Sequence, residues 1–206
     1  MSEEERDNVS DVLIWKDLET TGLDVNRDVI LEVAIVVTDN DLNELGHYAS
    51  VVVDYDPDMF IPDTQARTDP AQILVWENHW ETGLIQEIKA VCDDSDQIPT
   101  LEVVQAHMID LLNAHGVTEE THHRKKPPLC GSSVASFDRK FGDKNFPDFM
   151  SLLHYRSIDV STLLELRKRW RPDFVDPDSK GAHRALADIR SSIDYLRSYR
   201  SSGFIG

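Results

Sequence analysis

The run from residue 29 to residue 37, Val-Ile-Leu-Glu-Val-Ala-Ile-Val-Val, constrains the fold more than any other segment. Side chains branched at Cβ favour extended backbone, so this run predicts a buried strand. A shorter apolar run at residues 12–15, which leads into Asp17, predicts a strand before it, and residues 48–53 predict one after it. Three strands so close together in the chain indicate an antiparallel meander.

The rest of the chain alternates between helical and extended patterns. Four apolar residues near the C-terminus recur at 3-4-3 spacing and give the strongest helical pattern: Leu186, Ile189, Ile193 and Leu196. Other expected elements are helices at 72–80, 85–91, 101–112 and 137–145 and strands at 128–130 and 157–160. Thr162 with Glu165 fits a capping box for one more helix. This order predicts an α/β fold, a mixed five-stranded sheet flanked by helices.

The chain's length and its apolar segments limit the classes of protein it can belong to. A chain of 206 residues is long enough for one domain, which we expect at residues 12–206 after a flexible acidic tail at 1–11. We expect no membrane association, because no apolar stretch approaches the roughly 20 residues that a membrane span needs and the N-terminus is not that of a signal peptide. Two isolated cysteines, Cys92 and Cys130, are typical of a reducing compartment, so a cytoplasmic location is expected.

Charge narrows the choice of partners. The formal net charge of −17 would repel a long nucleic-acid duplex. Basic residues are nevertheless concentrated between Arg156 and Arg171. That segment is either a local site for a short anionic ligand or a solvated helix face, and the sequence leaves both readings open.

Asp17 and Glu19 are two residues apart at the end of the first predicted strand. Side chains at i and i+2 of a strand share a face, so the two carboxylates would point the same way. Carboxylates held that close repel each other unless a cation neutralises them, and oxygen-only ligands suit Mg²⁺ or Mn²⁺. Alone the pair is a weak signal, since acidic strand ends are usually solvated.

Three further residues extend this pair. Asp138 stands near a predicted helix start, where an acid could instead complement the helix dipole. His183 precedes Asp188 by five residues at the start of the last helix, and histidine is suited to accept a proton near neutral pH. Together the four carboxylates and His183 indicate a phosphodiester hydrolase with two divalent cations, in which His183 deprotonates the attacking water.

These residues resemble the motifs of the DEDDh class of 3′–5′ exonucleases. Asp17 and Glu19 match the first motif, Asp138 the second, and His183 with Asp188 the third. Within that class the chain is most similar to oligoribonuclease, as a divergent member. Four stretches carry the similarity: 13–24, 30–39, 154–162 continuing to Arg169-Trp170, and 183–199.

The resemblance implies a ribonuclease-H-like fold, two Mg²⁺ or Mn²⁺ ions and a homodimer. It implies an exoribonuclease that degrades short single-stranded RNA, dinucleotides above all, to nucleoside 5′-monophosphates. It also implies substrate-binding roles: His154, Arg156 and Ser161 on the 5′ phosphate, Tyr155 stacking on a base across the dimer, Leu18 as a wedge between bases, and Trp76 lining the same pocket.

Three features depart from the family pattern. The second motif, Gly131 to Asp138, is one residue longer, and Ser132 replaces an asparagine, so either Ser132 or Ser133 would meet the phosphate; we favour Ser133. The segment from Trp76 to Leu84 is shortened, and its substrate-side histidine is either His79 or absent. Thr20 stands where oligoribonucleases usually have methionine.

Other readings remain open at this point. The long acidic loop at 54–71 and the Phe137-Asp138 pair favour a DEDDh exonuclease of broader range, acting on RNA 3′ ends or single-stranded DNA. A binding module without activity would be expected to lack a motif residue, and none is missing. A zinc site from His122, His123 and Cys130 matches no standard spacing, so an exposed loop is expected there.

Overall fold

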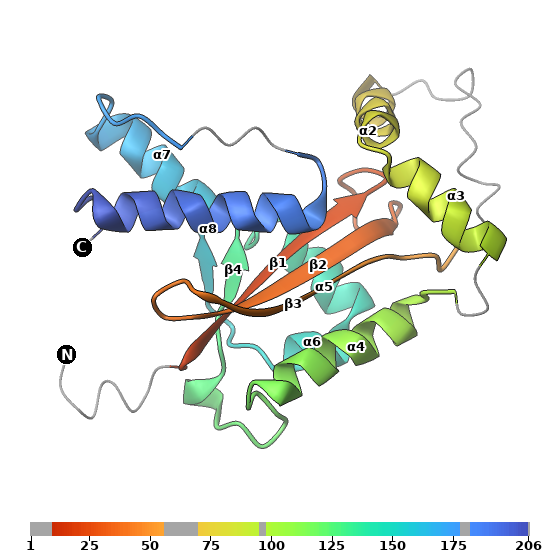
Figure 1. Ribbon diagram of the computed structural model, residues 1–206, viewed down its shortest axis with the longest axis horizontal. Helices are drawn as coiled ribbons and strands as arrows, with labels where there is room; N and C mark the ends of the chain where they lie inside the picture. The colour runs from red at the N-terminus through yellow and green to blue at the C-terminus, as the bar shows by residue number, and fades with distance from the viewer. Residues whose placement is uncertain (1–9, 56–69, 95–97, 178–181, 206) are drawn as a thin grey trace.

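The computed structural model describes residues 10–55, 70–94, 98–177 and 182–205, which form one sheet covered by helices on both faces (Figure 1). The sheet has five strands in the order β3-β2-β1-β4-β5. They are β1 (Val12–Thr20), β2 (Ile30–Asp39), β3 (Glu44–Val51), β4 (Leu129–Gly131) and β5 (Ser157–Asp159). The predicted mixed five-stranded sheet is confirmed.

The described helices follow the predicted order. They are α2 (Pro70–Glu81), α3 (Leu84–Asp94), α4 (Leu101–Ala114), α5 (Asp138–Asn145), α6 (Pro147–Ser151), α7 (Val160–Trp170), α8 (Ala185–Ser201) and the 3-10 helix η2 (His123–Lys125). Two of them, η2 and α6, were not expected, because elements of three and five residues are too short to show a helical period. None of the described helices is both long and apolar enough to cross a membrane.

The predicted antiparallel meander is confirmed for β1, β2 and β3. Glu19 of β1 lies opposite Glu32 of β2, which brings two acids to neighbouring positions in the sheet. The third strand begins at Glu44 and not at Tyr48 as expected. Its first half is polar and partly exposed, so the apolar pattern in the sequence covers only its end.

The other edge of the sheet is parallel. β4 pairs with β1 and β5 pairs with β4, both in parallel. The carboxyl ends of β1, β4 and β5 therefore meet at one edge of the sheet, and their amino ends meet at the opposite edge. This arrangement places the residues that follow β4 and β5 beside the end of β1.

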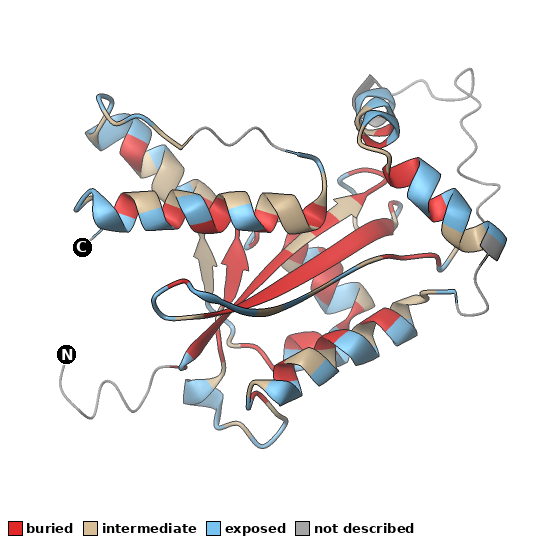
Figure 2. Cartoon of the chain, in the orientation of Figure 1, coloured by how far each residue is buried: buried red, intermediate tan, exposed pale blue. Residues whose placement is uncertain are grey.

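Apolar side chains on the two faces of the sheet form separate cores. Figure 2 shows the buried residues concentrated on the central strands of the sheet. One core includes Ile14 and Leu18 of β1 and side chains from α4, α5 and α6. The other includes Leu13 and Trp15 of β1 and the buried face of α8. A third cluster joins α2 and α3 to the ends of β2 and β3. The strand alternation thus sends odd-numbered side chains of β1 toward α8 and even-numbered ones toward α5.

The capping box expected at Thr162 is wrong. The side chain of Asp159 caps α7 by accepting a hydrogen bond from the Ser161 amide at 3.0 Å, so the helix begins at Val160. Because α7 starts directly after β5, Thr162 already lies inside its first turn. Most of the expected acidic tail, residues 1–9, and Gly181 before His183 lie outside the described residues.

Candidate active site

Asp17 and Glu19 lie near the carboxyl end of β1 and face α8, as the strand alternation predicts. Asp188 lies in the first turn of α8, where it accepts hydrogen bonds from the amides of Ala182 at 2.9 Å and Arg184 at 3.3 Å. One oxygen from each of the three carboxylates lies within 4.8 Å of the other two. The structure therefore brings two strand acids and one helix acid together at a spacing that a cation can bridge.

Asp138 is the first residue of α5 and is only 1% exposed. Its Oδ1 atom is buried and has no hydrogen-bond partner in the described part of the chain. The nearest cation is Lys16, whose Nζ lies 4.0 Å from that oxygen and donates to the Asp138 backbone carbonyl at 3.1 Å. A buried carboxylate oxygen without a donor fits a metal ligand, because burying it without a partner is unfavourable.

Burial and mutual repulsion raise the pKa values of these carboxyl groups. The pKa of Asp17 is well above its ordinary value because of burial, then repulsion from Asp138 and Glu19. Burial and repulsion from Asp188 raise the pKa of Glu19 to about 8. Burial raises the pKa of Asp138 to about 6, although Lys16 opposes the shift. A divalent cation would reverse these shifts by favouring the ionised form.

His79 lies beside Glu19 and is a second reason to expect a cation at this site. Its Nε2 donates to the Thr20 carbonyl at 2.8 Å, and burial lowers its pKa, so the ring is neutral and Nδ1 carries a lone pair. That atom lies 3.7 Å from Oε2 of Glu19. Two acceptors at this distance favour a proton or a cation between them. The sequence left open whether a histidine from this segment reaches the site, and the structure places His79 there.

His183 lies just before α8 and is exposed. Its backbone φ of 48° is in the left-handed region, which a non-glycine residue adopts only where its surroundings hold it. This position, before the first turn of the helix that carries Asp188, agrees with the placement predicted from the five-residue spacing.

The sequence analysis missed an ion-pair network behind His183. Glu32 of β2 accepts two bonds from Arg184 Nε, at 3.1 and 3.2 Å, one from Arg184 Nη2 at 2.9 Å and one from the Ala185 amide at 3.0 Å. Arg184 also donates to Glu87 of α3 at 2.5 Å. Glu32 thereby caps the start of α8 and fixes the residue beside His183. The sequence carried one signal of this network, which is the position of Glu32 as the single acid inside the apolar run at 29–37.

Two residues expected to contact bases lie in the core. The Leu18 side chain is 6% exposed and packs on the α5 face of the sheet, opposite Asp17 and Glu19. Trp76 is 5% exposed and belongs to the cluster that joins α2 and α3 to β2. The Leu18 side chain therefore points away from the face that carries Asp17 and Glu19, and the base-contacting roles of Leu18 and Trp76 stay predictions.

Ser133 and Ser161 come together beside the carboxyl ends of β4 and β5. The Ser133 amide donates to Ser161 Oγ at 2.9 Å and to Asp159 Oδ1 at 3.1 Å, and the two hydroxyl oxygens are 3.2 Å apart. Ser132 instead turns to α8, where its hydroxyl contacts that of Ser192 at 2.9 Å. The arrangement supports Ser133, and not Ser132, as the partner of Ser161.

His154, Tyr155 and Arg156 lie in the segment before β5, at the edge of the sheet where the parallel strands begin. The His154 ring contacts the Tyr155 ring, with centroids 4.4 Å apart, and the Arg156 guanidinium lies 5.3 Å from the Tyr155 ring centre. No hydrogen bond or ion pair of the described residues joins these three to Ser133 or Ser161. Tyr155 lines a cavity that also reaches Asp159 and Thr162, and the expected 5′-phosphate role of these residues stays a prediction.

The alternative zinc site is not formed. Cys130 is buried between the sheet and α8, whereas His122 and His123 are exposed on η2. Across the described ranges, the one group of three or more potential metal ligands is Asp17, Glu19 and Asp188.

Comparison with known proteins finds relatives of this chain among the exonucleases. A family model described as exonuclease matches residues 14–74. The oligoribonuclease of Mycobacterium tuberculosis is 40% identical over 199 residues, which is 96% of this chain and 83% of the relative. The oligoribonuclease of Colwellia psychrerythraea is 40% identical over 193 residues, covering 93% of this chain and 95% of the relative.

Solved structures share the fold at low identity. Escherichia coli exonuclease I in complex with a 5cy-dT13 oligonucleotide has a TM-score of 0.62 and 18% identity over 93% of this chain. Its zinc-bound complex with single-stranded DNA also has a TM-score of 0.62. This chain spans about two fifths of exonuclease I, 41% and 42% in the two structures, so the likeness concerns the fold of one part of that protein.

Proposed function

The chain belongs to the oligoribonuclease family of 3′–5′ exoribonucleases that act on short oligonucleotides, and from this premise we propose that dinucleotides are its main substrate. The products would be nucleoside 5′-monophosphates. The observation that carries the proposal is the cluster of Asp17, Glu19 and Asp188, with the unpartnered oxygen of Asp138 beside it. The proximity of three acids and the lack of a hydrogen-bond partner for the buried Asp138 oxygen both support a cation site.

The metal ligands in this proposal are the four carboxylates, and the ions are two Mg²⁺ or Mn²⁺. Oxygen-only ligands suit these hard cations better than zinc. When bound, a pair of divalent cations supplies charge for the attacking and leaving oxygens of phosphodiester hydrolysis. Lys16, buried behind Asp138, holds that acid in place through its backbone carbonyl and compensates part of its charge.

His183 is the general base in this proposal. It is exposed to solvent, and it directly precedes the helix that carries Asp188. In this position its imidazole would accept the proton of the attacking water. Glu32 binds the Arg184 side chain and the Ala185 amide and so holds the backbone next to His183. The base would therefore keep its position relative to the metal ligands.

Substrate length would be limited by residues that hold the 5′ end. Ser133 and Ser161 supply paired hydroxyls beside the end of β5. Tyr155 is 74% exposed and lies at the other edge of the sheet, so it would reach a site in a second subunit. We propose a homodimer in which each subunit lends Tyr155 to its partner, and the exposure of this ring supports it. Stacking on a tyrosine is tolerant of base identity, which suits an enzyme for any dinucleotide.

Length dependence of hydrolysis tests the proposed function. Purified protein is incubated with Mn²⁺ and 5′-labelled RNA of two, five and twenty nucleotides, with Asp17→Asn as the matched inactive control. We expect rapid cleavage of the dinucleotide alone. Equal rates on all three lengths would support the exonuclease of broader range, and no product at any length from folded protein would support a binding module.

The dimer and the cellular location need separate tests. Light scattering under assay conditions should give twice the 23.5 kDa chain mass, and a monomer there would exclude subunit sharing of Tyr155. Cys92 and Cys130 are free thiols in the structure, which supports the cytoplasm as the site of action. Fractionation of cells that express the protein would test that location.

A further inference from the structure

A lysine lies in the apolar core on the face of the sheet that packs against α5. Lys16 stands between Trp15 and Asp17 in β1, and its side chain is 0% exposed. Even-numbered side chains of β1 point toward α5, so Lys16 shares its face with Ile14 and Leu18 of the core there. Lysine is almost never buried in this way without a partner, because burial removes the hydration of its charge. A buried lysine next to the carboxylates therefore calls for a physical reason.

The partner of Lys16 is Asp138, which it contacts through two different groups. The Lys16 Nζ donates to the Asp138 backbone carbonyl at 3.1 Å and lies 4.0 Å from the carboxylate oxygen Oδ1. Among the described residues, that carbonyl is the one hydrogen-bond acceptor of the ammonium group, which carries three donors. Of the acids that attract the ammonium group, Asp138 acts most strongly, followed by Asp17 and Asp143. The charge of Lys16 is thus directed mainly at Asp138.

This position of the lysine leaves the Asp138 carboxylate open but makes a cation there less favourable. At 4.0 Å the ammonium group attracts Oδ1 without donating a hydrogen bond to it, and this buried oxygen has no donor in the described part of the chain. A divalent cation bound to that oxygen would be repelled by the charge of Lys16. Because buried charges are screened little by water and salt, this repulsion is strong.

The other three carboxylates are placed differently. Asp17, Glu19 and Asp188 each bring one oxygen within 4.8 Å of the other two, and Asp138 is not a member of that group in the described structure. The Lys16 side chain lies on the opposite face of β1 from Asp17, because the two residues are neighbours on a strand. The site therefore has one part with three clustered acids and another part in which a single acid already faces a cation.

We propose that Lys16 sets the affinity of the site for the second of its two divalent cations, so that this ion binds firmly only together with a phosphodiester. The inference rests on the four metal ligands of the proposed function. Four ionised carboxylates and two divalent cations balance in charge, and Lys16 adds one positive charge. The phosphodiester of the substrate brings one negative charge, which offsets that of the lysine. Binding of the second cation and binding of substrate should therefore favour each other.

A purely structural role for the lysine predicts a change of the opposite sign. If Lys16 only anchored α5, its removal would loosen Asp138 and weaken the binding of any cation that this acid holds. If the charge of Lys16 sets the affinity, Lys16→Met should tighten the binding of the second cation, because the repulsion is lost. Methionine suits this test, since it is unbranched and flexible and the surrounding side chains of the core are apolar.

Binding of Mn²⁺ to the full-length protein without substrate tests the proposal. Electron paramagnetic resonance of the free ion gives the number and the affinity of the bound ions without any need for turnover. The variants are Lys16→Met and Lys16→Gln, the second of which keeps a hydrogen-bond donor but not the charge. The matched control is Lys140→Met, which removes the same charge from an exposed position on α5. AMP, a nucleoside 5′-monophosphate, is the probe for phosphate.

We expect the wild type to bind one Mn²⁺ at least about tenfold more tightly than the second, and AMP to tighten the binding of the second. In both Lys16 variants the second ion should bind at least about tenfold more tightly than in the wild type, and AMP should have a smaller effect. The Lys140 control should change by less than about twofold, because an exposed charge is screened.

Two results would overturn the role of Lys16 and leave the proposed function standing. One is two Mn²⁺ ions of equal affinity in the wild type. The other is unchanged or weaker binding of the second ion by a Lys16 variant that still unfolds in a cooperative thermal transition. A wild type that binds no Mn²⁺ would overturn this inference and the proposed metal site together.

Discussion

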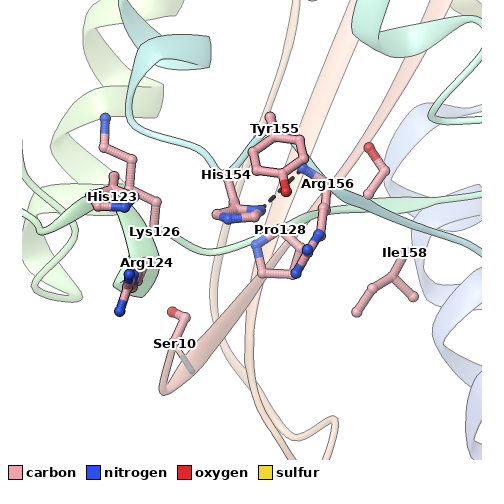
Figure 3. Close-up of a pocket in the computed structure, with 10 residues that line it drawn as sticks. Ser10, His123, Arg124, Lys126, Pro128, His154, Tyr155, Arg156 and Ile158 are labelled. Atoms are coloured by element: carbon pink, nitrogen blue, oxygen red, sulfur yellow. Dashed lines mark hydrogen bonds between the residues drawn. The ribbon is translucent and has the colours of Figure 1, made fainter. Parts of the chain in front are cut away.

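The carboxylate cluster and a basic pocket lined by Arg124, Lys126, His154 and Arg156 (Figure 3) lie at opposite edges of one sheet and are built in opposite ways. The acids stand on β1, α5 and α8, where strand register and helix geometry fix their positions and burial raises their pKa values. The cations of the pocket stand on η2 and on irregular segments, and most of them are exposed. Chemistry needs positions fixed to fractions of an ångström, whereas recognition of an anion by exposed charges tolerates looser placement.

Removal of one carboxylate should have the largest effect on the rate of dinucleotide hydrolysis. Asp138→Asn keeps the shape of a 1% exposed side chain but removes its charge. Because metal ions supply several kcal/mol of transition-state stabilisation, we expect dinucleotide hydrolysis to fall by roughly a thousandfold or more. Calorimetry with Mn²⁺ should show weakened binding. Asp148→Asn, an acid on α6 away from the cluster, is the control, and unchanged turnover in Asp138→Asn would exclude it as a ligand.

His183→Ala should remove the base and leave the metal ligands intact. General-base catalysis contributes about 10² to 10⁴ in rate, so we expect a loss of that size in kcat with Mn²⁺ affinity preserved. His107→Ala, an exposed histidine on α4, is the matched control. If the His183 variant turns over dinucleotide at the wild-type rate, the base must be another group.

Weakening the ion pair between Glu32 and Arg184, the residue next to His183, should have an intermediate effect on the rate. Glu32→Gln keeps the size of the side chain but loses the charge that faces Arg184 and the Ala185 amide. We expect kcat to fall about tenfold with little change in KM, because the base is displaced while substrate contacts remain. Glu44→Gln, which breaks the surface pair with Arg190, should change neither. A KM effect without a kcat effect would contradict a positioning role.

Salt concentration should affect KM, through the exposed cations at one edge of the sheet, more than kcat, which depends on the buried acids at the other edge. If exposed Arg156 holds substrate phosphate, KM for the dinucleotide should rise several-fold between about 50 and 200 mM salt because its charge is screened. The kcat should stay nearly constant, since the buried acids are screened much less. Steady-state kinetics at a series of salt concentrations measures both. The same dependence in Arg156→Gln would assign the effect to other groups.

The smallest expected effect is on the stability of metal-free protein. The folded-state pKa of Glu19 is about 8, against an ordinary value of 4.5, so between those values the folded state holds a proton that the unfolded state has released. The free energy of unfolding should therefore fall as pH rises through this window, lowering Tm by about 5 °C. Saturating Mn²⁺ or Glu19→Gln should flatten the dependence, and a Tm that rises with pH would contradict it.

Much of the site was predictable because its residues stand where local rules apply. The alternation of β1 placed Asp17 and Glu19 on one face, and the spacing from His183 to Asp188 required His183 to precede the helix. Lys16, Glu32 and His79 were not assigned because each acts on a residue far away in the chain. Lys16 is 122 residues from Asp138, and Glu32 is 152 residues from Arg184. The period of a hydrophobic pattern carries no information about contacts between residues so far apart in the chain.

The sequence by itself determined the order of strands and helices and the types of chemical groups in the site. Hydrophobic periodicity and side-chain type act over a few residues, so they can be read without the fold. Only the tertiary structure decided that β4 and β5 run parallel to β1, and hence which residues share an edge. That pairing gathered the acids at one edge and Arg124 and Arg156 at the other, because packing on the sheet depends on contacts between distant segments.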